Sequence, residues 1–158
     1  MEHLKLKLLS MKRYQFILTM IGISILMMMV SSFILDTLDL IAKERPVEQK
    51  SFWYFFSALI PAPIVETYVF QKLPIDFFWE SFSKKWPLLF ISAVPFGVLH
   101  YFKEYFIRDI IYAFGLGLIF AYAYIVARKR EDMNPLAAVI VIHAGYNLFG
   151  VVAHLIVD

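Results

Sequence analysis

The sequence predicts an all-α protein, a polytopic membrane helix bundle of about five transmembrane helices. Hydrophobic residues occupy 61% of its 158 positions, whereas a soluble domain contains about 45–50% apolar residues. The mean hydropathy is +0.69. Aromatic residues, which collect at membrane interfaces, make up 18%. At about 20 residues per span, the length leaves no room for a second soluble domain.

The apolar segments divide the chain into a basic N-terminal segment, residues 1–13, and one transmembrane helical domain, residues 14–157. The first apolar stretch has no small-residue cleavage site, so it is expected to be a retained helix rather than a signal peptide. In the fourth span, Gly115 and Gly117 favour close helix packing. The expected spans are, approximately, residues 14–35, 51–71, 86–102, 109–127 and 135–157.

Prolines mark where two of the expected helices break or begin. Pro61 and Pro63 interrupt the second span and should kink it, because proline removes a backbone donor and clashes with the preceding turn. Asn134 is placed to cap the last helix, with Pro135 at its first helical position. The aromatic connector of residues 72–85 is expected at a membrane interface.

Basic residues predict the orientation of the bundle. Ten of the 15 Lys and Arg residues fall in the N-terminal segment, residues 72–85 and residues 128–134. The positive-inside rule places that richer side in the cytoplasm. We therefore expect a multi-pass protein of the cell membrane with a cytoplasmic N-terminus and an outer C-terminus. The net charge of +2 is small, and it gives no argument for a nucleic-acid partner.

Glu66 is the strongest single candidate for chemistry. It follows the double-proline kink in an apolar stretch, and an ionisable side chain costs a few kcal/mol inside a bilayer. A buried carboxylate must be neutral or paired, which suits a general base. Thr67 and Gln71 lie four residues apart and can share hydrogen bonds along one helix face. The alternative is a Glu66 solvated at the cytoplasmic interface, because the second span ends about five residues later.

Two further polar clusters lie in separate spans. Phe96-x-x-x-His100 lies near the end of the third span, and His143-x-x-x-Asn147 lies inside the fifth. Residues four apart share one face of a helix. Each cluster has an ordinary alternative: His100 as a neutral, hydrogen-bonded histidine, and His143 with Asn147 as a polar clasp between helices. His154 is expected to be an interfacial histidine.

Together these side chains supply the parts of a hydrolytic site. Glu66 can activate a water, His100 can hold or deprotonate that water, and His143 with Asn147 can stabilise an oxyanion. A carboxylate with two histidines can also bind Zn²⁺. The spacing does not decide between these two readings, and the more specific His-Glu-x-x-His pattern is missing from the sequence.

The expected depths of Glu66 and His100 conflict. With the span limits given above, Glu66 lies near the cytoplasmic end and His100 near the outer end. At about 1.5 Å per residue the two side chains would miss each other by roughly 10 Å or more. We therefore expect the second span to start later, around Ala58, or the third to extend toward Arg108.

The three clusters resemble the motifs of the CPBP family of intramembrane proteases. That family includes the CAAX prenyl protease and the bacterial Abi proteins of bacteriocin processing or immunity. Its motifs are Glu-Glu-x-x-x-Arg, Phe-x-x-x-His and His-x-x-x-Asn on successive core helices. Within a core of about residues 51–157, the matching segments here are Glu66-Thr67-Tyr68-Val69-Phe70-Gln71, Phe96-Gly97-Val98-Leu99-His100 and His143-Ala144-Gly145-Tyr146-Asn147.

The resemblance implies proteolysis near the cytoplasmic side of a membrane. Glu66 and His100 would activate a water, and His143 with Asn147 would form the oxyanion site. No cofactor is expected; the alternative is a divalent metal held by Glu66, His100 and His143. The chain contains no cysteine, which excludes thiolate catalysis and disulfides.

Two positions depart from the family motif and leave two hypotheses open. Thr67 stands in place of the second Glu and Gln71 in place of the Arg, so a carboxylate and a guanidinium are lost together and neither is left unpaired. The first hypothesis is an endopeptidase acting on a peptide or membrane-protein substrate. The second is a non-catalytic protein of the same fold, a bacteriocin-immunity factor or a scaffold for a partner helix. A small transporter or channel fits least, because the spans contain few acidic residues and no repeat pair.

Overall fold

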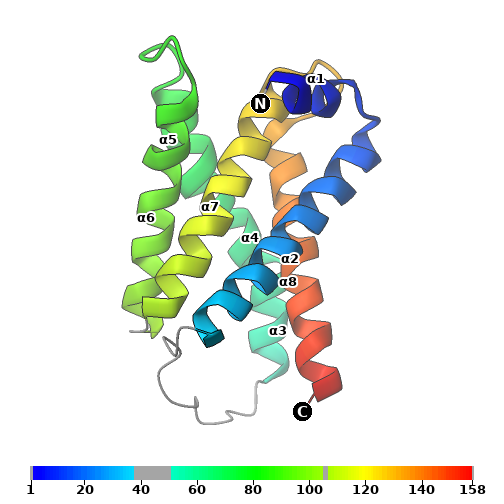
Figure 1. Ribbon diagram of the computed structural model, residues 1–158, viewed down its shortest axis with the longest axis vertical. Coiled ribbons are helices and arrows are strands. Elements are labelled where there is room, and N and C mark those ends of the chain that lie inside the picture. The colour runs from blue at the N-terminus through cyan, green and yellow to red at the C-terminus, as the bar shows by residue number, and fades with distance from the viewer. Residues whose placement is uncertain (1, 38–50, 105–106, 158) are drawn as a thin grey trace.

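The computed structural model describes residues 2–37, 51–104 and 107–157, and over these ranges it contains helices and no strand. The expected all-α fold is therefore confirmed. Figure 1 shows one bundle, with α1 and α5 at its upper end and α3 and the C-terminus at its lower end. The elements are α1 (Glu2–Ser10), α2 (Arg13–Thr37), α3 (Phe52–Leu59), α4 (Pro61–Glu66), the π-helix η1 (Thr67–Lys72), α5 (Leu73–Phe77), α6 (Trp86–Glu104), α7 (Ile107–Arg128) and α8 (Pro135–Val157).

Among the described residues, three helices are long and apolar enough to cross a membrane, and α6 contributes a shorter apolar stretch, Trp86–His100. The three long segments are Arg13–Leu35, Asp109–Arg128 and Pro135–Ile156. The second expected span differs from a single helix, because its residues form the successive pieces α3, α4, η1 and α5. The helices thus form the expected membrane-type bundle, with its second hydrophobic segment broken.

Pro61 accounts for the break between α3 and α4. Proline has no N–H to donate to the carbonyl of Ser57, four residues earlier. Between the two helices Ile60 takes non-helical backbone angles, φ −121° and ψ −72°. The kink expected from the prolines is therefore confirmed. The chain then widens into η1, a π-helical geometry that is frequent at functional sites. Glu66, the last residue of α4, lies between the kink and this π-helix.

Small residues bring α7 close to its neighbours, as the sequence predicts. α7 packs against α6, α8 and α2. A methyl group added at Gly117 would lie 3.0 Å from the Cα atom of Ala93 on α6, and one added at Gly115 would lie 2.9 Å from the side chain of Met27 on α2. The contact at Gly117 brings α6 close to α7, and the contact at Gly115 brings α2 close to α7.

The start of α8 agrees with the prediction. The Asn134 side-chain oxygen accepts a hydrogen bond from the Ala137 backbone N–H at 3.1 Å, and Pro135 is the first residue of the helix. This cap fixes where α8 begins. It places His143 eight residues further along, roughly 12 Å down the helix axis.

Candidate functional site

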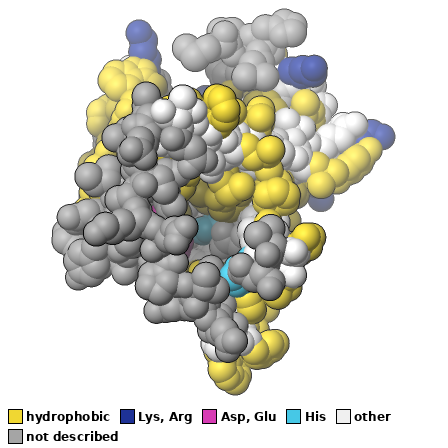
Figure 2. Space-filling view, turned by 60° about the horizontal axis from the view of Figure 1, so that its bottom comes forward, with side chains coloured by type: hydrophobic (Ala, Val, Ile, Leu, Met, Phe, Trp, Pro, Cys, Tyr) yellow, Lys and Arg dark blue, Asp and Glu magenta, His cyan; other side chains and the backbone are white. Residues whose placement is uncertain are grey.

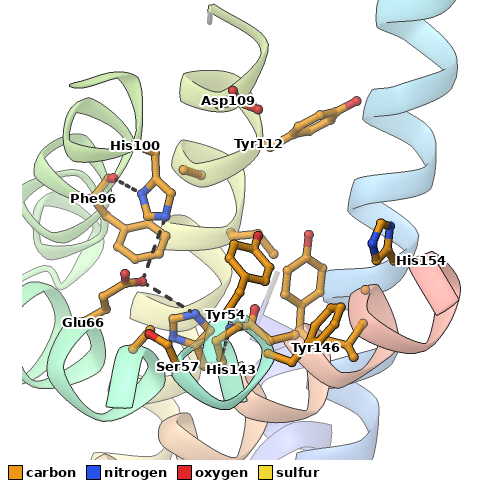
Figure 3. A pocket seen from close by; sticks show the side chains of 18 residues that line it. Tyr54, Ser57, Glu66, Phe96, His100, Asp109, Tyr112, His143, Tyr146 and His154 are labelled. Carbon is orange, nitrogen blue, oxygen red and sulfur yellow. Dashed lines mark hydrogen bonds and ion pairs between the residues drawn. The ribbon is translucent and has the colours of Figure 1, made fainter. Parts of the chain in front are cut away.

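Three side chains from three helices converge at one point inside the bundle. Glu66 comes from α4, His100 from α6 and His143 from α8. Glu66 Oε2 lies 3.8 Å from His143 Nε2 and 4.0 Å from His100 Nε2 (Figure 3). Glu66 is 8% exposed and His143 4%. Glu66 is therefore buried beside two imidazoles, and it is not the solvated end of a span.

The conflict in depth disappears because the helical run containing Glu66 is longer than expected. Helix begins at Phe52 and continues, through the kink, to Phe77, so Glu66 lies near the middle of the run. The expected start around Ala58 is wrong. The expected extension of α6 beyond His100 is confirmed, since that helix ends at Glu104.

The spacing of the three side chains leaves room for a small molecule between them. The two separations from Glu66 exceed an ordinary hydrogen bond of about 2.8 Å. Two atoms that both bind one water at that length lie roughly 4–4.5 Å apart, depending on the angle at the water. The separations of 3.8 Å and 4.0 Å are close to this value. The geometry therefore suits a water shared by Glu66 and a histidine.

The ring of His100 is oriented by contacts with Phe96 on its own helix. Its Nδ1 lies 2.8 Å from the backbone carbonyl of Phe96, and the Phe96 ring lies against the imidazole with 4.6 Å between ring centroids. A carbonyl only accepts, so Nδ1 carries the hydrogen. In the neutral ring, Nε2 then has a lone pair directed toward Glu66. His100 can accept a proton or a hydrogen bond from a water at this place.

His143 is held by Thr67 on its other ring nitrogen. Thr67 Oγ1 lies 3.5 Å from His143 Nδ1, and both residues are buried. The ring also packs against Phe120, with centroids 4.6 Å apart. A threonine hydroxyl that donates to Nδ1 leaves the hydrogen of a neutral imidazole on Nε2. In that tautomer His143 presents a donor beside Glu66, as an oxyanion site requires.

Gln71 does not share hydrogen bonds with Thr67, as the sequence suggested. The expected hydrogen bond between Thr67 and Gln71 is wrong, because Thr67 faces His143 instead. Within the described residues, both polar atoms of the Gln71 side-chain amide are buried without a hydrogen-bond partner. The reason is local: in the π-helix η1, residues four apart no longer lie directly above one another as they do in an α-helix.

Asn147 joins α8 to α3. Its Nδ2 donates to the backbone carbonyl of Ala58 at 2.7 Å, near the end of α3 and next to the proline kink. The polar clasp proposed for this residue is therefore present. A primary amide has two N–H groups. One donates to Ala58, and the side chain that carries the second also lines the pocket.

A pocket of about 490 Å³ extends from this cluster toward the lower end of the bundle. Glu66, His100, His143 and Asn147 all line it, and its far end is formed by residues that include His154. The described lining residues are Tyr54, Phe55, Ser57, Ala58, Ala62, Glu66, Phe96, His100, Asp109, Tyr112, Ala113, Leu116, His143, Tyr146, Asn147, Gly150, Val151 and His154.

Three tyrosines of this pocket were not anticipated from the sequence. They are Tyr54 on α3, Tyr112 on α7 and Tyr146 on α8. The Tyr112 hydroxyl lies 2.9 Å from Ser32 Oγ on α2, so a helix outside the cluster holds this part of the wall. Only Tyr146 carries a signal in the sequence, since it lies three residues after His143 and shares its helix side.

Whether Glu66, His100 and His143 hold a divalent metal stays a prediction. In the part of the chain that the structure describes, no group of three His, Cys, Asp or Glu side chains is arranged to hold a metal ion. Nitrogen and oxygen ligands at about 2.0–2.2 Å from one tetrahedral Zn²⁺ lie roughly 3.3 Å from each other. The separations around Glu66 are wider than that.

The fold and the site define a helical membrane protein in which a carboxylate and two imidazoles converge inside the bundle. Residues 48–149 match the family model of the type II CAAX prenyl endopeptidases, described as Rce1-like. The chain therefore belongs to the Rce1-like family of CAAX-type intramembrane endopeptidases. The match runs from just before α3 into α8 and includes Glu66, His100, His143 and Asn147, whereas α1 and α2 lie outside it.

The family match confirms the resemblance to the CPBP proteases, and with the apolar helices it makes the chain a multi-pass membrane protein. No match is found among curated proteins. No solved structure matches either.

Proposed function

We propose that this protein is an intramembrane endopeptidase of the glutamate type, acting on a peptide or a membrane protein. The observation that carries the proposal is the position of Glu66 Oε2, which lies 3.8 Å and 4.0 Å from the Nε2 atoms of His143 and His100. Family membership supports the reaction class. The buried location supports a site that works away from bulk water.

In this proposal Glu66 is the general base for a water that attacks the peptide carbonyl carbon. The water proton passes to the carboxylate, while the lone pair of His100 Nε2 orients the water. The carbonyl oxygen becomes an oxyanion, which His143 Nε2–H and the second N–H of Asn147 stabilise. The proton held by Glu66 then passes to the leaving nitrogen as the C–N bond breaks. No step requires a cofactor.

Thr67 adapts the site to the loss of the family's second Glu. The Thr67 hydroxyl faces His143 Nδ1 at 3.5 Å. The carboxylate and the guanidinium of the family motif are both missing here, so neither is stranded without its partner. A neutral hydroxyl can still select the imidazole tautomer that presents Nε2–H.

The test is a comparison of new protein N-termini in membranes of cells that produce wild type or Glu66→Gln. Glu80→Gln serves as the matched control, because it makes the same chemical change at an exposed residue of the upper end. We expect termini that depend on wild type, persist with Glu80→Gln and with a chelator, and disappear with Glu66→Gln. Cleavage that survives Glu66→Gln would contradict the mechanism.

A non-catalytic role as a bacteriocin-immunity factor or a partner-helix scaffold is the second candidate. It is favoured by the unsatisfied amide of Gln71, which shows that the family's Arg position is not replaced by an equivalent contact. Protection of cells by His143→Ala equal to that of wild type, together with no new N-termini, would support this role. Loss of both protection and cleavage in His143→Ala supports the protease.

A further inference from the structure

A second hollow lies at the upper end of the bundle, where α1 turns back onto α2. α1 ends at Ser10 and α2 begins at Arg13, and the space between the two helices has a volume of about 560 Å³. It shares none of its described lining residues with the pocket that contains Glu66, so it is a separate feature of the molecule. The described residues that line it are Lys7, Ser10, Met11, Gln15, Leu18 and Thr19.

The turn that forms this hollow is held in place by Arg130, from the loop after α7. The Arg130 guanidinium donates to the backbone carbonyl of Leu8 at 2.8 Å and to that of Met11 at 2.5 Å. It also lies over the ring of Phe16, 5.4 Å from the ring centroid. The Leu8 side chain belongs to the buried core, with 1% of it exposed. The hollow is therefore fixed by the fold and is not a gap beside a loose chain end.

One side of the hollow is polar and positively charged. Lys7 lines it, and Lys12 lies exposed in the turn between the two helices. Gln15 Oε1 accepts a hydrogen bond from the Lys12 backbone N–H at 3.1 Å, and the amide nitrogen of the same side chain carries two N–H donors. No Asp or Glu belongs to the lining that the structure describes. Ammonium and amide donors without a carboxylate among them favour an anionic ligand such as a phosphate.

The other side of the hollow is apolar and continues down the outer face of α2. Leu18 is 64% exposed and Leu26 60%. Between them lies Gly22, where an added methyl group would meet no described atom within 4 Å. A shallow groove therefore runs from the hollow along the helix. Residues three or four apart share a helix face, and the exposed row of α2 consists of Gln15, Leu18, Gly22, Leu26, Met29 and Phe33.

The hollow lies near a membrane surface, at the depth where a phospholipid headgroup joins its acyl chains. The apolar segment Arg13–Leu35 is long enough to cross a membrane, so its first turns lie close to one face of the bilayer. Figure 2 shows described Lys and Arg side chains toward the upper and right-hand edges of the molecule, beside hydrophobic side chains. Half of the hydrocarbon core is about 15 Å thick, which corresponds to about ten residues of helix. An acyl chain that starts at Leu18 would thus cover Gly22 and Leu26.

We propose that the hollow between α1 and α2 is a binding site for an anionic phospholipid. Lys7 and the amide of Gln15 bind the phosphate, and one acyl chain lies in the groove over Leu18 and Gly22. A free phosphate would use the polar side alone, whereas a phospholipid uses both sides of the site. The bound lipid stabilises the α1–α2 turn by contacting both helices. This inference goes beyond the proposed protease function and does not depend on it.

The test uses the full chain, purified in detergent and titrated with dioleoyl phosphatidylglycerol or dioleoyl phosphatidylcholine. Native mass spectrometry counts the bound lipids, and the midpoint of thermal unfolding reports binding to the folded state. Lys7→Gln removes the charge from the polar side, and Gly22→Leu fills the groove. Lys84→Gln is the matched control, because it makes the same change at an exposed residue of the connector after α5. The midpoint without added lipid checks that each variant folds, and Gly22→Ala replaces Gly22→Leu if the larger side chain prevents folding.

We expect phosphatidylglycerol to bind more tightly than phosphatidylcholine and to raise the unfolding midpoint further. Lys7→Gln should weaken the binding of phosphatidylglycerol about fivefold, which is the contribution of one Lys near an anionic membrane surface. Lys84→Gln should leave this affinity unchanged. Gly22→Leu should weaken the binding of both lipids, because the leucine side chain occupies the path of the acyl chain.

Four results would overturn the proposal. Equal binding of the two lipids would show that the site does not select an anion. Equal losses for Lys7→Gln and Lys84→Gln would show only a diffuse attraction between the basic surface and the lipid. A midpoint shift of the same size with glycerol phosphate would show a phosphate site without an acyl chain, and unchanged binding in Gly22→Leu would remove the groove from the site. Each result is read without a cleavage assay, so it leaves the proposed function untouched.

Discussion

Two carboxylates in this molecule have opposite surroundings. At the upper end Asp76 is fully engaged: Lys72 Nζ lies 2.7 Å from it, the Tyr124 hydroxyl lies 3.1 Å from both carboxylate oxygens, and Arg128 pairs with it as well. In the middle of the bundle Glu66 has two histidine nitrogens at 3.8 Å and 4.0 Å. Asp76 thus has neighbours at hydrogen-bond length, whereas Glu66 has neighbours at the distance that one water spans.

The difference separates a structural carboxylate from one suited to chemistry. A carboxylate whose donors are all in contact stabilises the fold and has little capacity left for a ligand. A buried carboxylate beside a gap can bind a water and take its proton. Both lie on one helical run, α3 to α5, with η1 between them. Substitutions at these two positions should therefore affect different properties.

Glu66→Gln should have the largest effect on cleavage. Glutamine keeps the size of the side chain and removes the base, so the rate should fall by about 10²–10⁴-fold. Thermal unfolding in detergent should stay close to that of wild type, because glutamine fills the same space and keeps a polar side chain there. The assay is the appearance of Glu66-dependent N-termini beside a melting curve. A large loss of stability with retained cleavage would contradict this prediction, because it would make Glu66 the structural carboxylate.

Asp76→Asn should have the opposite pattern. Three donors lose a charged acceptor, which we expect to lower the free energy of unfolding by about 1–3 kcal/mol. Cleavage per folded molecule should change far less than in Glu66→Gln. The melting temperature and the cleavage rate of the same preparation check both statements. Unchanged stability would show that the contacts of Asp76 with Lys72, Tyr124 and Arg128 do not stabilise the fold.

Gln71→Met should stabilise the protein. A buried polar group without a hydrogen-bond partner costs about 1–3 kcal/mol, and methionine fills a similar volume without polar atoms. The midpoint of thermal unfolding should therefore rise. Gln71→Glu is the informative contrast, because it buries a carboxyl in the same place and should lower the midpoint. A lower midpoint for Gln71→Met would mean that the amide has a partner in the membrane.

Thr67→Val should slow cleavage by up to about tenfold, which corresponds to one hydrogen bond of up to about 1.5 kcal/mol. Valine keeps the shape of threonine but cannot contact His143 Nδ1. Thr67→Ser keeps the hydroxyl and should restore the rate. A shift in the pH profile of cleavage with Val and not with Ser would locate the effect in the imidazole. Equal cleavage rates for Thr67→Val and Thr67→Ser would show that the hydroxyl has no part in the mechanism.

The smallest expected effect concerns Asp132 in the upper loop. The hydrogen bonds from Arg130 lower the pKa of the Asp132 carboxyl to about 2, and Arg13 adds a weaker attraction. A depressed pKa contributes stability above the ordinary value of about 4, and this contribution is lost as pH falls toward 2. Asp132→Asn should therefore flatten the dependence of the melting temperature on pH between about 4 and 2. An unchanged slope would show that the pair is too exposed to matter.

The residues of the buried polar cluster could be predicted because each has a high energetic cost inside an apolar segment. Glu66, His100 and His143 interrupt apolar segments, and burying such groups requires partners. The proline kink and the cap at Asn134 were also predictable, because both depend on backbone chemistry within a few residues. The number of continuous spans was harder: the prolines indicated a kink, and the segment proved to be four helical pieces.

Partners across helices could not be predicted in the same way. The contact of Thr67 with His143, the clasp of Asn147 on Ala58 and the place of Tyr112 in the pocket all depend on how separate helices cross. The π-helix adds a second difficulty, because its wider turn changes which side chains lie above one another. A fixed four-residue spacing therefore gave the wrong partner for Thr67.

The sequence by itself determined the all-α membrane character, the polar set on separate helices and the uneven distribution of basic residues. These are properties of composition and local spacing. The tertiary structure decided that Glu66, His100 and His143 meet with a gap between them and that the pocket extends along α8 toward its C-terminal end. The physical reason is that each helix satisfies its own backbone, whereas the kink, the π-helix and the close packing of α6 on α7 decide which side chains meet.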